Sequence, residues 1–156
     1  MNFDDVLNVT AGDIADFQPL PEGFYVVEIT EMPEIDENWT SRAGNSGIKI
    51  TFKLNVVGIH DVPDDMLEEF SGDPLKAKMT YWLYIVTRDE DTLEAGRRNL
   101  KEFLKSFGVV SDDSTSLNEA FANLPGQQAL ARVAHTVDDK DPSRVFANID
   151  RFSPID

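Results

Sequence analysis

The chain has 156 residues and carries 29 aspartates and glutamates against 14 lysines and arginines, a formal net charge of −15. This length suits a single domain, and a hydrophobic content of 41% supplies enough apolar material for a folded core despite the charge. Because the sequence has no cysteine, a disulfide scaffold, a thiol nucleophile and cysteine-based metal sites are excluded. The acidic balance also argues against unspecific binding to nucleic acid or to anionic membranes as a bulk property.

The first 19 residues form an acidic extension, and a single domain is expected over residues 20–156. The extension contains neither lysine nor arginine, so it lacks the basic region of a secretory signal. No part of the chain approaches the ~18 consecutive apolar residues of a membrane span. We therefore expect a cytoplasmic protein that has no membrane partner.

Three strands are expected in the first half of the domain. Residues 23–30 alternate in polarity after a break rich in proline, and residues 48–56 show the cleanest period of two in the chain. Residues 78–86 are rich in aromatic and β-branched side chains, which also favour a strand. Residues 31–47 mix proline, glycine and asparagine with many acids, and this composition predicts a long loop.

The spacing of apolar residues changes from a period of two to a helical period after the third strand. Asp91 and Glu94 have the spacing of a capping box, and apolar residues follow at helical spacing as far as Gly108, which predicts an amphipathic helix. A second, short helix is expected to begin at Ser116 and to end at Pro125-Gly126.

Two further strands are expected at residues 127–137 and 143–152, joined by an acidic turn. The order is then strand, long loop, strand, strand, helix, strand, strand. Five strands with a helix between the third and the fourth is the arrangement of the OB-fold, a small five-stranded Greek-key β-barrel. The expected fold class is therefore mainly β, an OB-fold with one α-helix between strands 3 and 4 and a short second helix.

Several short stretches of this sequence resemble a family of small phage proteins. The likeness covers roughly residues 20–155 and is carried by GFYVVEI at 23–29, GIKITFKLNVVG at 47–58, NLKEFLKSFGV at 99–109, LPG at 124–126, and Asn148-Ile149 before Phe152-Ser153-Pro154. Members of this family are similar to OB-fold single-stranded-DNA-binding proteins and often belong to phage replication and recombination modules. The resemblance implies a DNA-binding protein of the host-cell cytoplasm that is not an enzyme, needs no cofactor, and has single-stranded DNA and phage replication or recombination proteins as partners. A homodimer is compatible with the sequence.

The acids are distributed unevenly along the chain. Residues 48–60, 74–88 and 120–137 contain no aspartate or glutamate, yet they hold six of the fourteen bases. Depletion of acids from strands is common whatever the function. The distribution nevertheless permits a neutral or positive sheet face within an acidic protein.

On the sheet face opposite the expected core, lysines alternate with aromatic side chains. Such a surface suits a single strand, because a base stacked on a ring contributes about 1–3 kcal/mol while cations contact the phosphates. We expect Trp39 and Arg42, in the long loop, to close over this face and Arg132 to add a phosphate contact. An aromatic residue on a strand is about as often packed beneath a loop or helix as it is a base platform. The candidate nucleic-acid-binding residues are Trp39, Arg42, Lys49, Lys53, Lys78, Trp82, Tyr84 and Arg132.

Three alternative functions each rest on a single feature. The acidic surface suits a protein-interaction module that docks on a basic recombinase or helicase, or that mimics DNA. The acidic stretch 61–73 and the turn Asp138-Asp139-Lys140 suggest a metal-dependent nuclease, but neither has the spacing of a known metal motif, and solvated loops are the simpler interpretation. A β-rich virion protein is the third alternative. We expect no catalytic residue and no metal ligand.

Overall fold

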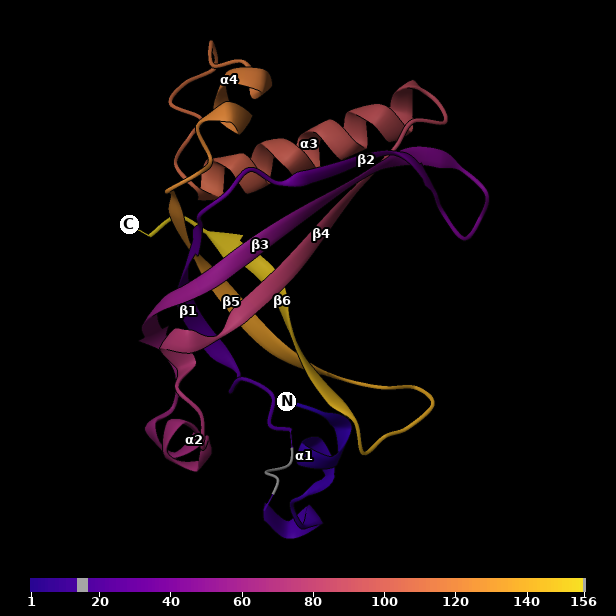
Figure 1. Cartoon of the computed structure of the whole chain (residues 1–156). Helices are drawn as coiled ribbons and strands as arrows, with labels where there is room; N and C mark the ends of the chain where they lie inside the picture. Colours follow the sequence, from indigo (N-terminus) through magenta and orange to yellow (C-terminus); the bar gives the residue numbers. More distant parts are fainter. Residues whose placement is uncertain (14–16, 156) are drawn as a thin grey trace.

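The structure, a computed structural model that describes residues 1–13 and 17–155, is mainly β. Its strands are β1 (Gly23–Ile29), β2 (Glu34–Thr40), β3 (Ser46–Asp61), β4 (Lys78–Val86), β5 (Gln128–Val137) and β6 (Val145–Ser153). In the described part of the chain they form one open antiparallel sheet, with the order β2-β3-β1-β5-β6 and with β4 also paired to β3. Figure 1 shows β3 and β4 crossing over β5 and β6, with the longest helix across one end of the sheet.

Five of the six strands, β1, β3, β4, β5 and β6, confirm the five strands predicted from the sequence. The central one is β3, in which the buried side chains Ile50, Phe52 and Leu54 alternate with more exposed neighbours. β4 alternates in the same way, because Leu83 and Ile85 are buried whereas Trp82 and Tyr84 are exposed. The predicted assignment of the two sheet faces is therefore confirmed on these two strands.

The prediction of a long loop over residues 31–47 is wrong. Residues 34–40 form β2, which pairs antiparallel with β3 through partners such as Ile35 and Ile50. Six of the seven side chains of β2 are exposed, so the strand has no buried face that alternation would reveal. Pairing along the backbone of β3 holds this segment in place, and residues 31–33 and the short turn 41–45 are what remains of the predicted loop.

The hydrophobic core lies between the curved sheet and the helix α3 (Glu90–Ser106). Phe103 and Leu104 of α3 are buried, and the ring centroid of Phe103 lies 4.2 Å from that of Phe52 on β3. A second helix, α4 (Leu117–Ala122), adds the buried Ala120. Burying this apolar surface stabilises the domain at roughly 25 cal/mol per Å² removed from water. The most deeply buried large side chains are Tyr25, Phe52, Phe107, Ile29, Leu54, Leu104, Leu124, Val27, Val56 and Val133.

The predicted start of the main helix is wrong by two residues. The N-cap is Asp89, whose Oδ1 accepts a hydrogen bond from the backbone N–H of Thr92 at 2.9 Å. The Thr92 hydroxyl in turn accepts from the Asp89 backbone N–H at 3.2 Å, which completes a capping box two residues earlier than the predicted one. Ser116 caps α4 as predicted, since its hydroxyl accepts from the Glu119 N–H at 3.1 Å.

Four short helical segments were not predicted. They are α1 (Phe3–Leu7), the 3-10 turn η1 (Ala11–Asp13), α2 (Asp64–Glu69) and the 3-10 turn η2 (Pro74–Lys76). The first two lie within the expected acidic extension, whose residues 14–16 are outside the described residues, as is Asp156 of the expected domain. Figure 1 shows α1 and α2 at the end of the sheet opposite α3. None of the described helices is long and apolar enough to cross a membrane.

The strands β4 and β6 each have only one neighbour in the described sheet. Their free edges face each other, and the rings of Tyr81 on β4 and Phe152 on β6 meet edge to face with centroids 4.8 Å apart. No strand ladder joins these edges among the described strands. We call the line between β4 and β6 the open seam of the sheet.

Candidate nucleic-acid interface

The surface of β3 and β4 that points away from the core carries aromatic rings and lysines, as predicted. We call this surface the outer β3–β4 face, and we include Trp39 of β2 because its ring lies on it. Trp82 and Tyr84 are each 45% exposed, whereas Leu83 between them is buried. The strands therefore present these rings to solvent rather than to the core. The members of the face are Trp39, Lys49, Thr51, Lys53, Lys78, Thr80, Trp82 and Tyr84.

Two of these aromatic residues are in direct contact although they come from different strands. The ring of the half-buried Trp39 lies against that of Tyr84, with centroids 4.8 Å apart and planes tilted by 34°. Gly47 of β3, the cross-strand partner of Trp39, makes room for this contact. A Cβ at Gly47 would lie 2.9 Å from the Trp39 ring and 2.5 Å from the backbone oxygen of Ile85. The glycine thus lets an indole lie directly on the sheet.

Lys49 adds a positive charge beside these rings. Its Nζ lies 5.8 Å from the centroid of the Trp82 ring, which is within range of a cation–π interaction. On β4 its directly opposite residue is Tyr84, and on β2 it is Asp36. Lys49 takes part in no ion pair among the described residues. Its ammonium group therefore remains available to an anionic ligand.

Lys53 lies on the same face, but two carboxylates already hold it. Its Nζ is 3.2 Å from an oxygen of Glu34 and 3.8 Å from one of Glu31. The hydrogen bond to Glu34 and the charges of both acids raise the pKa of Lys53 above its ordinary value. The charge of Lys53 is therefore largely offset by Glu31 and Glu34, two acids of the segment that was predicted to be a loop.

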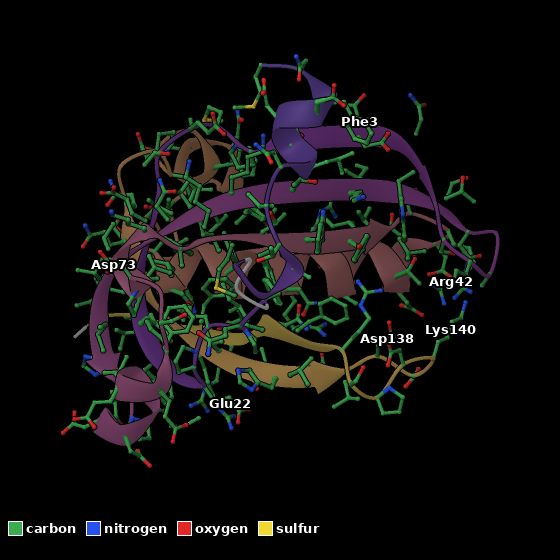
Figure 2. The ribbon with its side chains drawn as sticks, turned by 60° about the horizontal axis from the view of Figure 1, so that its bottom comes forward. Phe3, Glu22, Arg42, Asp73, Asp138 and Lys140 are labelled. Carbon is green, nitrogen blue, oxygen red and sulfur yellow. The ribbon has the colours of Figure 1, made fainter. Side chains whose placement is uncertain are left out.

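Lys78 and Arg42 occupy the margins of the face. Lys78, at the start of β4, lines a cavity of about 440 Å³ together with Trp82 and Phe146. Arg42 lies in the turn between β2 and β3, and Figure 2 shows it at the tip of this hairpin. Neither base takes part in an ion pair in the described part of the chain.

Arg132 lies outside the outer β3–β4 face. It is exposed on β5, and its guanidinium contacts Asp150 of β6 at 3.4 Å. Its cross-strand partners are Phe24 on β1 and Arg151 on β6. Of the eight predicted residues, the structure thus brings together Trp39, Lys49, Trp82 and Tyr84, keeps Lys53 paired, and leaves Arg42, Lys78 and Arg132 at or beyond the margin.

Several residues with a bearing on binding were missed by the sequence reasoning. Glu34 determines the charge state of the surface near Lys53, but its position depends on the unexpected strand β2. Arg151 lies opposite Arg132 because the β5–β6 register shifts between Arg132 and Val133. A register shift of this kind leaves no signal in the alternation of the sequence. Gly47 carried a usable signal, because a glycine at the start of a clear strand marks a close approach.

The carboxylate clusters considered as metal sites are not part of this face. The acidic residues of α2 are exposed at the far end of the molecule (Figure 1). Asp138 is used in its own turn, where it accepts a hydrogen bond from the Lys140 backbone N–H at 2.9 Å. Within residues 1–13 and 17–155, no group of three or more histidine, aspartate or glutamate side chains is arranged to hold a metal ion.

No protein-family model matches this sequence, and a comparison with curated proteins finds no match. The function proposed below therefore rests on the geometry of the outer β3–β4 face.

Proposed function

We propose that this protein binds single-stranded DNA with little sequence preference through the outer β3–β4 face. The observation that carries the proposal is the aromatic group formed by the exposed Trp82 and Tyr84 and the half-buried Trp39, beside the unpaired Lys49. Large exposed rings that are not needed for the core indicate a binding surface. Every base has a π-face, so stacking on such rings is tolerant of sequence, and lysine contacts the phosphates.

We further propose that the sheet is an open form of the five-stranded OB barrel. Both β1 and β2 pair antiparallel with β3, whose partners run from Asp61 opposite Phe24 to Ser46 opposite Thr40. Counted as one interrupted strand, they reduce the strands to five, in the order third, second, first, fourth, fifth. The helix α3 then lies between the third and the fourth strand, as in an OB-fold, and the open seam is where such a barrel would close.

The net charge of −15 is compatible with this function because the charge is not spread evenly. Lys49 lies beside the aromatic group and Lys78 and Arg42 lie at the margin of the face, and none of the three has an acidic partner in the described ion pairs. The acids elsewhere repel a second nucleic acid and so limit unspecific association. With few phosphate contacts, the affinity for DNA should depend only weakly on salt. The slope of log affinity against log salt concentration is of order −0.7 for each phosphate neutralised on a single strand.

One observation favours a second function. Lys53 and Arg132 are both held by carboxylates of this chain, so two expected phosphate contacts are already engaged. A protein-interaction module with an acidic docking surface would have no use for these cations. Its partner would be a basic recombinase or helicase, and the bound partner would exclude DNA.

Fluorescence anisotropy of a labelled, unstructured oligonucleotide tests the main proposal. We expect saturable binding at low salt, weakening with added salt, and no competition from an equal concentration of duplex. Protection of single strands during replication or recombination, in the phage setting that the resemblance implies, would follow from such binding. Absence of binding at low salt would contradict the proposal and favour the acidic interaction module.

A further inference from the structure

A cavity of about 410 Å³ opens at the seam between β4 and β6, beneath α3. Its lining joins residues of the proposed interface to the strand on the other side of the seam, because Trp82 and Tyr84 border it from β4 and Arg151 borders it from β6. Phe103 of α3 and Phe152 of β6 pack with centroids 4.9 Å apart in its wall. The outer β3–β4 face therefore continues across the seam instead of ending at the edge of β4.

Beyond the seam, two arginines occupy directly opposite positions on neighbouring strands. Arg132 on β5 is the register partner of Arg151 on β6, and like charges in this position repel each other. Asp150 offsets only one of them, since it contacts Arg132 at 3.4 Å. Arg151 takes part in no ion pair among the described residues. An anion bound between the two guanidinium groups would relieve this repulsion.

An aromatic ring orients the unpaired arginine. The guanidinium carbon of Arg151 lies 5.5 Å from the centroid of the Phe24 ring on β1, and Phe24 is itself the cross-strand partner of Arg132. A guanidinium held against a ring keeps its planar set of donors free, and that set matches the oxygens of a phosphate. We call Phe24, Arg132 and Arg151 the arginine patch.

We propose that a single strand bound on the outer β3–β4 face crosses the open seam and places a backbone phosphate on the arginine patch, with Arg151 as the principal contact. This inference rests on the proposed function. Two acids beside this path are already engaged: Asp150 pairs with Arg132, and Glu102, which lines the cavity, lies 3.9 Å from Lys105. The strand path would thus run from aromatic rings on β4 to cations on β6 and β5.

The test compares Arg151→Gln with Arg98→Gln, an equal change of charge at an exposed position of α3 that does not border the seam. Each variant is titrated with unstructured oligonucleotides of roughly 6 and roughly 16 nucleotides, lengths within the range bound by single OB-folds. We expect Arg151→Gln to weaken binding of the long oligonucleotide several-fold, to reduce its salt slope by about 0.7, and to leave the short one unaffected. Arg98→Gln should resemble the unmodified protein with both.

The outcomes separate this inference from the function on which it rests. If the long oligonucleotide binds and Arg151→Gln equals Arg98→Gln, the crossing is wrong while the proposed function stands. Equal weakening of the short and the long oligonucleotide would also overturn the crossing, because Arg151 would then not act as a separate, distal contact. If the unmodified protein binds neither oligonucleotide, the proposed function itself fails. Thermal unfolding of both variants checks that the domain remains folded, and Arg151→Lys should restore binding only in part because it lacks the planar donors.

Discussion

The ring of Trp39 on β2 rests against the ring of Tyr84 on β4, with centroids 4.8 Å apart, although β3 lies between these two strands. The contact exists because Gly47 of β3 has no side chain to separate the rings. The contact joins a ring of β2 and a ring of β4 across β3 into one aromatic surface. Lys49 of β3 adds an unpaired positive charge beside this surface. The proposed binding of single-stranded DNA depends on this surface.

Replacement of Gly47 by alanine should disrupt the aromatic group. The added Cβ would meet the Ile85 oxygen at 2.5 Å and the Trp39 ring at 2.9 Å, so either the strand pairing or the indole must move. We expect a loss of roughly 1–3 kcal/mol in the free energy of unfolding, as for overpacked sites, and a changed tryptophan emission spectrum. Gly12→Ala is the control, because no heavy atom lies within 4 Å of a Cβ there. Equal stability of the two variants would show that the contact between the rings does not require a glycine at position 47.

Replacement of Trp82 by alanine should weaken DNA binding without unfolding the domain. The side chain is 45% exposed, so its removal leaves little cavity, but one base loses its stacking partner. The expected loss is about 1–3 kcal/mol of binding free energy, measured by anisotropy. Phe3→Ala removes another exposed ring, on α1 and outside the outer β3–β4 face, and should leave affinity unchanged. Normal binding by Trp82→Ala would place the interface elsewhere.

Replacement of Glu34 by glutamine should strengthen DNA binding. Glu34 accepts a hydrogen bond from Lys53 at 3.2 Å, and this bond is the main reason for the raised pKa of the lysine. Without the Glu34 carboxylate, Lys53 stays protonated at neutral pH and keeps only the longer contact to Glu31 at 3.8 Å, so its charge becomes more available to a phosphate. Glu68→Gln makes the same charge change at an exposed position of α2. If both variants bind equally more tightly, the gain reflects overall charge and not the release of Lys53.

The cap at Asp89 predicts a pH-dependent contribution to stability. The backbone N–H of Thr92 holds the pKa of the Asp89 carboxyl below its ordinary value of 3.8, with a smaller contribution from Arg88. Because the pKa is lower in the folded state, this stabilisation is present above pH 3.8 and is lost as the pH falls through the folded-state pKa. Asp89→Ala should therefore lower Tm at pH 7, with a gap from the unmodified protein that narrows in acid. Asp91→Ala, at the cap position predicted from the sequence, should change Tm little; a larger effect at Asp91 would contradict the observed cap.

The sequence was sufficient to predict the strands whose side chains divide between core and solvent. Alternation at Ile50, Phe52 and Leu54 gave the position of β3 and the outward direction of Lys49 and Lys53. The aromatic character of Trp82 and Tyr84 then indicated what the exposed face carries. These inferences depend only on the period of two that a pleated strand imposes.

The features that the sequence did not predict, namely β2, the ion pair of Lys53 and the arginine patch, depend on contacts between distant segments. Glu34 and Trp39 lie on a strand that is exposed on nearly all sides and rich in acids, which are depleted in strands, so its composition resembles a loop. The ion pair of Lys53 follows from that strand and was invisible without it. The arginine patch depends on a register shift between β5 and β6, which only the paired structure reveals.

Quenching of tryptophan fluorescence by an unstructured oligonucleotide tests the central claim most directly, because Trp39 and Trp82 are the two tryptophans of the chain and both lie on the outer β3–β4 face. Variants that each retain one tryptophan, Trp39→Phe and Trp82→Phe, separate the two signals. We predict saturable quenching at low salt in both variants, reversed by added salt. Binding by anisotropy without quenching of either tryptophan would contradict this interface, and an absence of any binding would contradict the function.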